Sequence, residues 1–451
     1  MSDPTRPTVP SSDYIEHARL EAARRGAAAQ PPESAFSGAP DAIIDRVRAE
    51  VAEARLRLIG LSHAVHAVAE PAFEEHASAE LVAAAVRSSG VEAEVGVAGL
   101  ETAVRAEFGS PDAGRTVAIL AEYDALPDIG HACGHNVIAA SAVGAFCALV
   151  AALDGDARRL PGRVVLLGTP AEEGRGGKEI MARHGAFDTI DAALMLHPFG
   201  FDACEQLWLG RRALEVTFTG IAAHASALPF MGRNALDAAS LMYQGIGLLR
   251  QQMLPVDRVH ASLPEGGDRP SVIVERSQLN LYVRSPYPET LRELSGRIAD
   301  IAHGAALMTG CGVQLDWDIH PPSMPVKANS ELAARWSAYQ RAVGRAPFPA
   351  GVVPDTLAAS TDFGNVSWLV PGIHPTIAIA EPRVAWHTRE FADAARSPQA
   401  DEAVVDGAFG LAATALDFLF DDELADEVSR EFDRNGGRIP AVRYFGEKGA
   451  L

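Results

Sequence analysis

The feature that most constrains the fold is an alternation of strand-like and helix-like segments in the first half of the chain. The apolar runs TVAILA, RVVLLG and AALML are each short enough for a buried strand, and the long apolar segment NVIAASAVGAFCALVAAL separates the first two. Strands that alternate with helices pair in parallel, because each helix carries the chain back across the sheet. This order predicts an α/β fold with a mainly parallel sheet flanked by helices.

The middle of the chain has a different order and predicts a separate domain. It reads strand, helix, strand, helix, strand, from ALEVTFTG to VQLDWDIH, which is typical of a small α+β domain. We therefore predict a main domain split into residues 42–212 and 327–420, with a smaller domain inserted at 213–326. Residues 1–41, rich in Ala, Pro and Ser, are predicted to form a flexible arm, and residues 421–451 a C-terminal tail.

The composition limits the partners of the chain. A formal net charge of -20 disfavours binding to nucleic acid or to an anionic membrane, since either surface needs clustered Lys and Arg. The longest apolar run, 137–153, is shorter than the ~20 residues of a membrane-spanning helix and is predicted to be a buried helix. The four cysteines are too few for a disulfide framework, and the N-terminus lacks a signal-peptide pattern. We expect a cytoplasmic protein without nucleic-acid or membrane partners.

The hexapeptide HACGHN at 131–136 contains the first candidate metal ligands, Cys133 and His135. It lies between a predicted strand and the predicted buried helix, where the backbone can hold two side chains against one ion. A thiolate and an imidazole are good ligands for zinc and its neighbours. By itself, the motif fits a buried structural cysteine with satisfied histidines equally well.

Two adjacent carboxylates, Glu172 and Glu173, follow the next predicted strand in TPAEEGRGG. Carboxylates that converge repel each other unless a cation lies between them, so one could bind metal while the other transfers protons. A solvated acidic turn is the structural alternative. A phosphate-binding loop is disfavoured, because Lys178 is followed by Glu179 and not by Ser or Thr.

His197 ends the third apolar strand, in AALMLHP. A single histidine at a strand end is usually a hydrogen-bonded structural residue. Here, however, the candidates in HACGHN and TPAEEG also follow strands, and open parallel sheets bind ligands in the crevice at the carboxyl ends of their strands. The shared position predicts one site formed by all three segments.

Three further residues stand at comparable positions. Asp124 follows the first strand, where it could orient a ligating imidazole or cap a turn. His387, in AWHTREF, follows the predicted strand PTIAIA and is a further candidate ligand. His224 lies in a Gly- and Ala-rich loop of the inserted domain, where it could donate to a substrate oxygen or be an ordinary surface histidine.

Several separated motifs together resemble those of the co-catalytic metallopeptidase family that contains aminoacylase, glutamate carboxypeptidases and carnosinase. They are DALP, HACGH, PAEEG, LHP, STDFGNVSWLVP and HTREF, in that order. The resemblance spans roughly residues 46–418. It is nearest the branch of aminobenzoyl-glutamate hydrolases, auxin-conjugate amidohydrolases and cytosolic dipeptidases. It implies a di-metal catalytic domain, an inserted lid domain that forms a homodimer, and hydrolysis of an amide or peptide bond in a small substrate.

The resemblance also implies roles for individual residues. Glu172 would be the general base, Asp124 the orienting carboxylate, and His224 the histidine placed over the substrate oxygen. Asn234 and Arg284 match candidate substrate contacts. The implied ligands of the two metal ions are Cys133, which would bridge them, His135, Glu173, His197 and His387.

Two departures from the family pattern bear on the substrate. Asn136 stands where the auxin-conjugate branch has Asp, which indicates the dipeptidase and aminobenzoyl-glutamate side of the branch. The lid segment SVIVERS lacks the Asn and Pro of many relatives. The two divalent ions would be zinc or manganese, since a thiolate favours zinc whereas carboxylates and imidazoles accept both.

The expected activity is metal-dependent cleavage of a dipeptide or N-acyl amino acid with a free carboxylate. The alternatives are an aminobenzoyl-glutamate-type amidohydrolase and a binding protein that keeps the fold without turnover. Loss of Glu172 or of several ligands would indicate the binding protein, and none is missing. A nucleotide-binding enzyme is disfavoured, because no glycine fingerprint follows the first strand.

Overall fold

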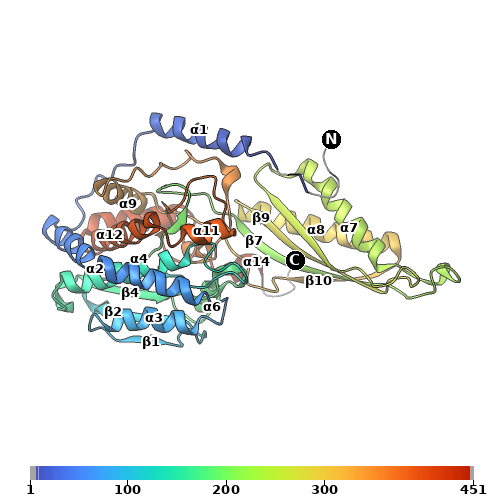
Figure 1. The fold of residues 1–451 in the computed structure, drawn as a ribbon, viewed down its shortest axis with the longest axis horizontal. Helices are drawn as coiled ribbons and strands as arrows, with labels where there is room; N and C mark the ends of the chain where they lie inside the picture. Colours follow the sequence, from blue (N-terminus) through green and yellow to red (C-terminus); the bar gives the residue numbers. More distant parts are fainter. Residues whose placement is uncertain (1–6, 9, 447–451) are drawn as a thin grey trace.

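A six-stranded, mainly parallel sheet forms the centre of the larger domain in the computed structural model, which describes residues 7–8 and 10–446 (Figure 1). Strand β3 pairs in parallel with β4 and β5, and β5 pairs in parallel with β11, while β1 and β2 form an antiparallel edge. This confirms the predicted α/β class. In sheet order the strands are Ala93–Val95 (β1), Val104–Gly109 (β2), Gly162–Gly168 (β4), Arg115–Ala121 (β3), Ala192–Leu194 (β5) and Gly372–Ile373 (β11).

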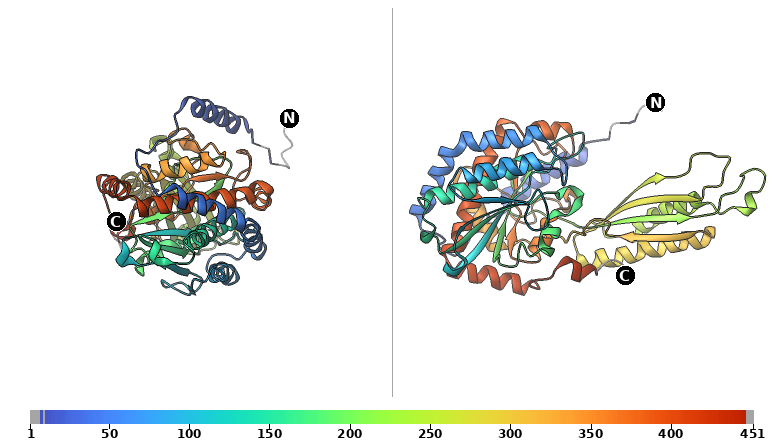
Figure 2. Two further views of the ribbon diagram at one scale, coloured as in Figure 1. Left: turned by 90° about the vertical axis from the view of Figure 1, so that its left-hand side faces the viewer. Right: turned by 90° about the horizontal axis from the view of Figure 1, so that it is seen from below.

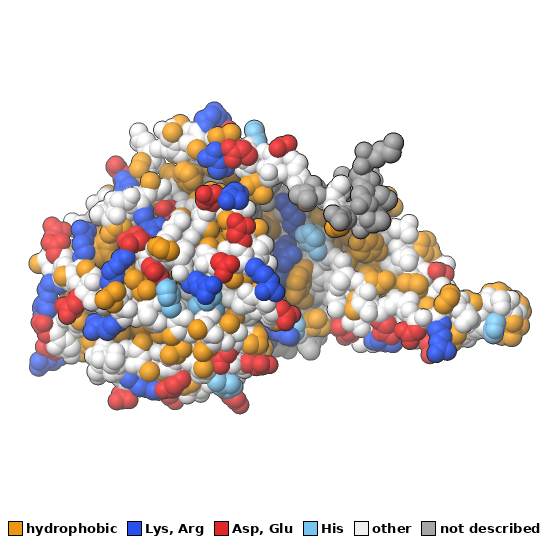
Figure 3. Space-filling view, viewed as in Figure 1, with side chains coloured by type: hydrophobic (Ala, Val, Ile, Leu, Met, Phe, Trp, Pro, Cys, Tyr) orange, Lys and Arg blue, Asp and Glu red, His pale blue; other side chains and the backbone are white. Residues whose placement is uncertain are grey.

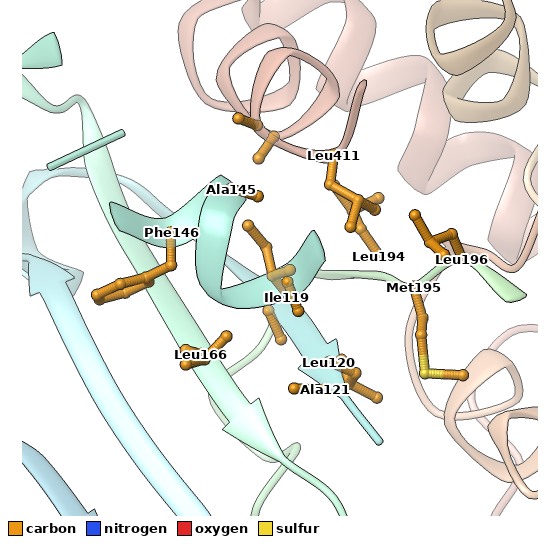
Figure 4. Close-up of a cluster of buried hydrophobic side chains, with 14 of the residues drawn as sticks. Ile119, Leu120, Ala121, Ala145, Phe146, Leu166, Leu194, Met195, Leu196 and Leu411 are labelled. Atoms are coloured by element: carbon orange, nitrogen blue, oxygen red, sulfur yellow. The ribbon is translucent and has the colours of Figure 1, made fainter. Parts of the chain in front are cut away.

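Two apolar helices, α4 (His135–Ala152) and α12 (Pro398–Phe420), pack against β3 and against each other. Strand β4 is buried along its whole length, so side chains cover both faces of the sheet. Figure 4 shows Ile119 of β3, Phe146 of α4 and Leu411 of α12 in the same buried cluster. By length and composition alone, both helices could cross a membrane, but most of each is buried inside this domain. The predicted buried helix at 137–153 is therefore confirmed as the greater part of α4.

The remaining elements of this domain surround the sheet. A short parallel pair, β6 (His197–Phe199) and β12 (Thr376–Ala378), continues the chain beyond β5 and β11. It brings segments far apart in the sequence to the same edge of the domain. The helices are α2 (Asp41–Val68), α3 (His76–Arg87), α5 (Glu172–Arg175), α6 (Gly177–Arg183), α9 (Ser330–Ala342), α10 (Phe363–Ser367) and α11 (Arg389–Ala394).

The inserted lid domain is a four-stranded antiparallel sheet with two long helices, α7 (Ala235–Leu249) and α8 (Pro288–Thr309). It has its own hydrophobic core and extends away from the larger domain (Figures 1 and 2). The sequence did not predict its edge strand β8, because Val259 is the only residue of that strand that is buried, and no alternation results. The strand order is β10 (Gly312–Trp317), β7 (Gly210–Thr219), β9 (Arg276–Ser285) and β8 (Arg258–Glu265).

Much of the predicted flexible arm is ordered structure. Helix α1 (Asp13–Ala28) buries Ala18 and Ala22, which lie one turn apart on the same side of the helix. The backbone N–H of Ala39 donates to Asp417 of α12 at 2.7 Å, which ties the following segment to the core. The structure thus shows residues 13–41 attached to the larger domain through a few buried alanines, among them Ala18, Ala22 and Ala39. Residues 1–6 and 9 lie outside the described residues.

The predicted C-terminal tail is also packed. Helix α13 (Asp422–Arg434) is amphipathic and buries Leu424 and Val428 in the core of the larger domain. Helix α14 (Ala441–Phe445) places its first and last residues in the core of the lid. The segment therefore joins both domains, and residues 447–451 lie outside the described residues.

Candidate metal centre

Five predicted ligands come together where the parallel strands end. Cys133 and His135 follow β3, Glu173 follows β4, and His197 follows β5. His387 follows β12, which pairs with the strand that His197 begins. Three overlapping sets have all their ligand atoms within 4.8 Å of one another: Cys133 with His135 and His197, Cys133 with Glu173 and His387, and His135 with Glu172 and Glu173. Cys133 belongs to both of the first two sets, as expected for a residue between two ions.

Hydrogen bonds leave one nitrogen of each inner histidine free for an ion. Nδ1 of His135 lies 2.8 Å from the backbone oxygen of Asp124 and 3.1 Å from its carboxylate, and Nδ1 of His197 lies 2.8 Å from the backbone oxygen of Pro198. Since these acceptors hold a proton on Nδ1, Nε2 of each ring is the nitrogen that can bind an ion. The carboxylate of Asp124 also accepts the backbone N–H of Glu173 at 2.8 Å, so it orients two ligand segments.

The backbone around the cluster adopts costly conformations. Ala171, which precedes Glu172, has φ 62°, and His387 has φ 60°. A residue other than glycine in this region costs about 1–3 kcal/mol, so surrounding contacts must hold it there. At Ala171 the backbone N–H donates to the buried carboxylate of Glu75 at 2.9 Å. Gly134 has φ 81°, and a Cβ there would lie 2.8 Å from Pro198, so only glycine fits between the two ligands of HACGHN.

The protonation chemistry of the cluster fits divalent cations. Nε2 of His135 and Oε1 of Glu173 are buried and have no hydrogen-bond partner among the described residues. Burial raises the pKa of Glu173 to about 7 and lowers the pKa of His197 to about 3, so the imidazole is neutral. Burial, with Glu122 and Glu173 nearby, raises the pKa of Glu172 well above its usual value. Burial lowers the pKa of His135, but Asp124 and Glu122 outweigh this and raise it well above its usual value. Carboxylates, a thiol and imidazoles that converge without a cation are unfavourable, whereas the same set can hold two divalent ions.

A buried charge network that the sequence analysis missed lies behind the cluster. The ammonium of Lys178 donates to Glu122 and, at 2.6 Å, to Asp362, and all three side chains are buried. The second oxygen of Glu122 lies 3.5 Å from Nε2 of His135. Burial lowers the pKa of Lys178, but the two carboxylates outweigh this and raise it above its usual value. In the sequence, Lys178 stood out only as part of a rejected phosphate-loop motif.

A cavity of about 400 Å³ connects the cluster to the lid. Its lid side contains Arg258, His260 and Arg284, and Figure 3 shows basic and histidine side chains in the recess between the two domains. Arg284 therefore lies where a substrate contact was predicted, with its Nε donating to Ser360 at 3.2 Å. The other wall contains Trp208 and Trp386. Of these residues, the sequence analysis named only Arg284. Arg258, His260 and Trp208 come from segments without a recognisable motif, and Trp386 was passed over beside the candidate ligand His387.

Two predicted site residues do not reach this cavity within one chain. His224 is exposed on the lid, where its Nδ1 accepts the backbone N–H of Ala227 at 3.2 Å. Asn234 caps α7, and its side chain accepts the backbone N–H of Leu236 at 3.0 Å. Neither residue lines the cavity. The side chain of Asn234 caps a helix, and its role as a candidate substrate contact stays a prediction.

Known proteins share both the sequence and the fold. Residues 118–406 match peptidase family M20/M25/M40. The chain is 38% identical to the Xaa-Arg dipeptidase of Mus musculus, over 89% of this chain and 95% of that protein. It is 29% identical to a chain of the p-aminobenzoyl-glutamate hydrolase of Escherichia coli, over 80% of this chain and 89% of that one. In fold it is similar to a dinuclear metal-binding peptidase of the M20 family from Bacillus subtilis, with a TM-score of 0.60 and 20% identity over 81% of this chain and 98% of that one.

Proposed function

The chain belongs to peptidase family M20/M25/M40, and on this basis we propose that it hydrolyses the amide bond of a dipeptide or N-acyl amino acid with a free carboxylate. Membership confirms the resemblance drawn from the motifs. The chain is a metal-dependent hydrolase, and the dipeptidase and aminobenzoyl-glutamate hydrolase among its relatives support this substrate class. The observation that carries the proposal is one cavity that joins the ligand cluster, Glu172 and a basic lid surface.

Different residues of the site can perform different steps of an amide hydrolysis. Two divalent ions, which Cys133, His135, Glu173, His197 and His387 would hold, would polarise the scissile carbonyl and make a water molecule more acidic. Glu172 lies beside the ligand cluster, so it can accept the proton of the attacking water and deliver it to the leaving nitrogen as the C–N bond breaks. The products are a carboxylate and a free amine. Asp124 holds His135 in the required tautomer throughout.

The lid supplies the charge that attracts the substrate carboxylate. Arg284 uses only its Nε in a hydrogen bond, so both terminal nitrogens can donate to a carboxylate in the cavity. Among the described residues, no acidic side chain forms an ion pair with Arg258 or Arg284. We expect the free carboxylate of the leaving amino acid to bind here. Zinc or manganese is the proposed metal, with the thiolate of Cys133 favouring zinc.

The location and assembly of the protein are also proposals. Four unpaired cysteines support a reducing cytoplasm, and the acidic net charge disfavours nucleic-acid and membrane partners. A homodimer through the lid is supported by exposed apolar side chains near His224. These are Ile221, Leu228, Phe230, Met231 and Val272. In such a dimer, His224 of one protomer would enter the cavity of the other and stabilise the oxyanion.

Mixing two inactive variants tests where His224 acts. Both His224→Ala and Glu172→Gln are expected to be strongly impaired alone. If His224 serves the neighbouring cavity, random mixing of the two variants should restore about a quarter of the wild-type sites, because half of the dimers are mixed and each contains one complete site. Turnover after protomer exchange is the measurement. No recovery, with mixed dimers verified by mass spectrometry, would place His224 outside the neighbouring site.

A substrate panel tests the function itself. The purified protein, loaded with zinc or manganese, should cleave dipeptides or N-acyl amino acids and lose this activity on chelation. The panel includes aminobenzoyl-glutamate, which distinguishes the amidohydrolase alternative, and each substrate with its carboxylate amidated. Amidation should lower kcat/KM by about 10-fold or more, since a charged hydrogen bond is lost. Efficient internal cleavage of a denatured protein would argue against a small-substrate enzyme.

A further inference from the structure

One wall of the cavity is a rigid, partly exposed tryptophan. Trp386 is half-buried, and its indole N–H donates to the backbone oxygen of Pro198 at 3.1 Å. Its ring stacks on Trp208 at a centroid distance of 5.7 Å and an interplanar angle of 16°, and meets Phe199 at 4.0 Å. Because one hydrogen bond and these aromatic neighbours hold the ring, the part of it that lines the cavity has a defined orientation.

The tryptophan lies on the ligand side of the cavity. Its ring packs edge-on against His197 at 5.3 Å, and it directly precedes His387. Arg258 and Arg284, by contrast, come from two paired strands of the lid, where their Cα atoms are direct cross-strand partners. A substrate whose leaving carboxylate binds the lid therefore places its acyl half beside Trp386.

The charges of the cavity decide what kind of acyl group fits. An indole face accepts flat or apolar groups and also cations. A cationic group would share the cavity with Arg258, Arg284 and His260, which no described acidic side chain neutralises by an ion pair. The carboxylates that line the cavity, Glu172 and Glu173, belong to the proton-transfer and ligand positions. An uncharged group therefore suits this wall better than a cationic one.

We propose that Trp386 is a specificity-determining residue that binds an uncharged aromatic or large apolar acyl group of the substrate. This inference rests on the proposed function, since it assumes that the acyl half lies at the ligand cluster. Covering the indole surface that lines the cavity removes apolar surface from water on both partners, which favours binding. Small acyl groups such as acetyl leave most of this face uncovered.

The test is a series of acyl groups on one leaving amino acid. N-acetyl, N-butyryl and N-benzoyl derivatives are compared in wild type and in Trp386→Ala, with kcat/KM as the measurement. We expect wild type to prefer the benzoyl over the acetyl substrate by about 10- to 100-fold, as for other hydrophobic pockets. Trp386→Ala should lower kcat/KM at least about 10-fold for the benzoyl substrate and less than about 3-fold for the acetyl substrate. Trp386→Phe should retain most of the preference.

Two controls separate this effect from damage to the site. Elemental analysis must show that Trp386→Ala keeps its metal, because the residue adjoins His387. Trp317→Ala removes a partly buried tryptophan of β10 that does not line the cavity, and it should leave the preference unchanged. Equal losses for all acyl groups in metal-loaded Trp386→Ala would overturn the proposal, as would a wild-type preference for dipeptides with an N-terminal arginine.

A binding measurement distinguishes failure of this inference from failure of the function. Benzoate and acetate are titrated by calorimetry into the metal-loaded Glu172→Gln protein, with and without Trp386→Ala. If Trp386→Ala weakens the binding of benzoate but not of acetate, the result supports the proposed role of Trp386, even if no amide in the panel is cleaved. If Trp386→Ala leaves the affinity for benzoate unchanged, the result contradicts the proposed role of Trp386, even if the panel confirms hydrolysis.

Discussion

Glu172→Gln is expected to lower kcat by about 10²- to 10⁴-fold while both metal ions stay bound. The change keeps the size of the side chain and removes the base that accepts the proton of water. Glu172 shares a set of close ligand atoms only with His135 and Glu173, whereas Cys133 links the sets around both proposed ion positions. The measurement combines steady-state kinetics with elemental analysis of the purified variant.

A matched variant makes this test specific. Cys133→Ala is expected to lose at least one ion, because it removes the thiolate common to two ligand sets. The two variants should therefore differ in metal content even if both are inactive. A Glu172→Gln protein that retains near-normal turnover would exclude Glu172 as the base, and one that loses metal would make it a ligand.

Lys178→Met is expected to lower the free energy of unfolding by about 3–5 kcal/mol, the usual cost of removing one partner from a buried ion pair. The substitution leaves Glu122 and Asp362 buried without their shared cation. Unfolding in urea is followed on the metal-free protein in the presence of chelator, so that loss of metal affinity does not contribute. The expected result is a clearly lower urea midpoint.

A surface pair of the same domain supplies the control. Arg55 of α2 pairs with Glu402 of α12 at 2.8 Å, and their side chains are 37% and 56% exposed. Exposed pairs of this kind contribute at most about 1 kcal/mol, so Arg55→Met should shift the midpoint little. Equal shifts for the two variants would show that the buried network does not stabilise the domain more than a surface pair does.

The sequence by itself determined the class of fold and most of the candidate centre. Strand and helix periods are local properties, and the alternation of short apolar runs with apolar helices leaves few ways to cover both faces of a sheet. Residues that directly follow neighbouring parallel strands all lie at the same edge of the sheet. For that reason, Cys133, His135, Glu173 and His197 could be assigned to one site before any distance was known.

Only the tertiary structure decided which residues far apart in the chain share a cavity. Lys178 pairs with Asp362, which lies 184 positions later in the sequence, and Trp386 stacks on Trp208 from a different segment. Such pairings depend on how elements pack, and no local pattern of hydrophobicity or charge encodes them. The packing of the arm and the tail could not be predicted for the same reason, since Ala18 and Phe445 become buried only where another element covers them. The structure of one chain does not bring His224 to the site, because this residue is exposed and lies outside the cavity of its own protomer.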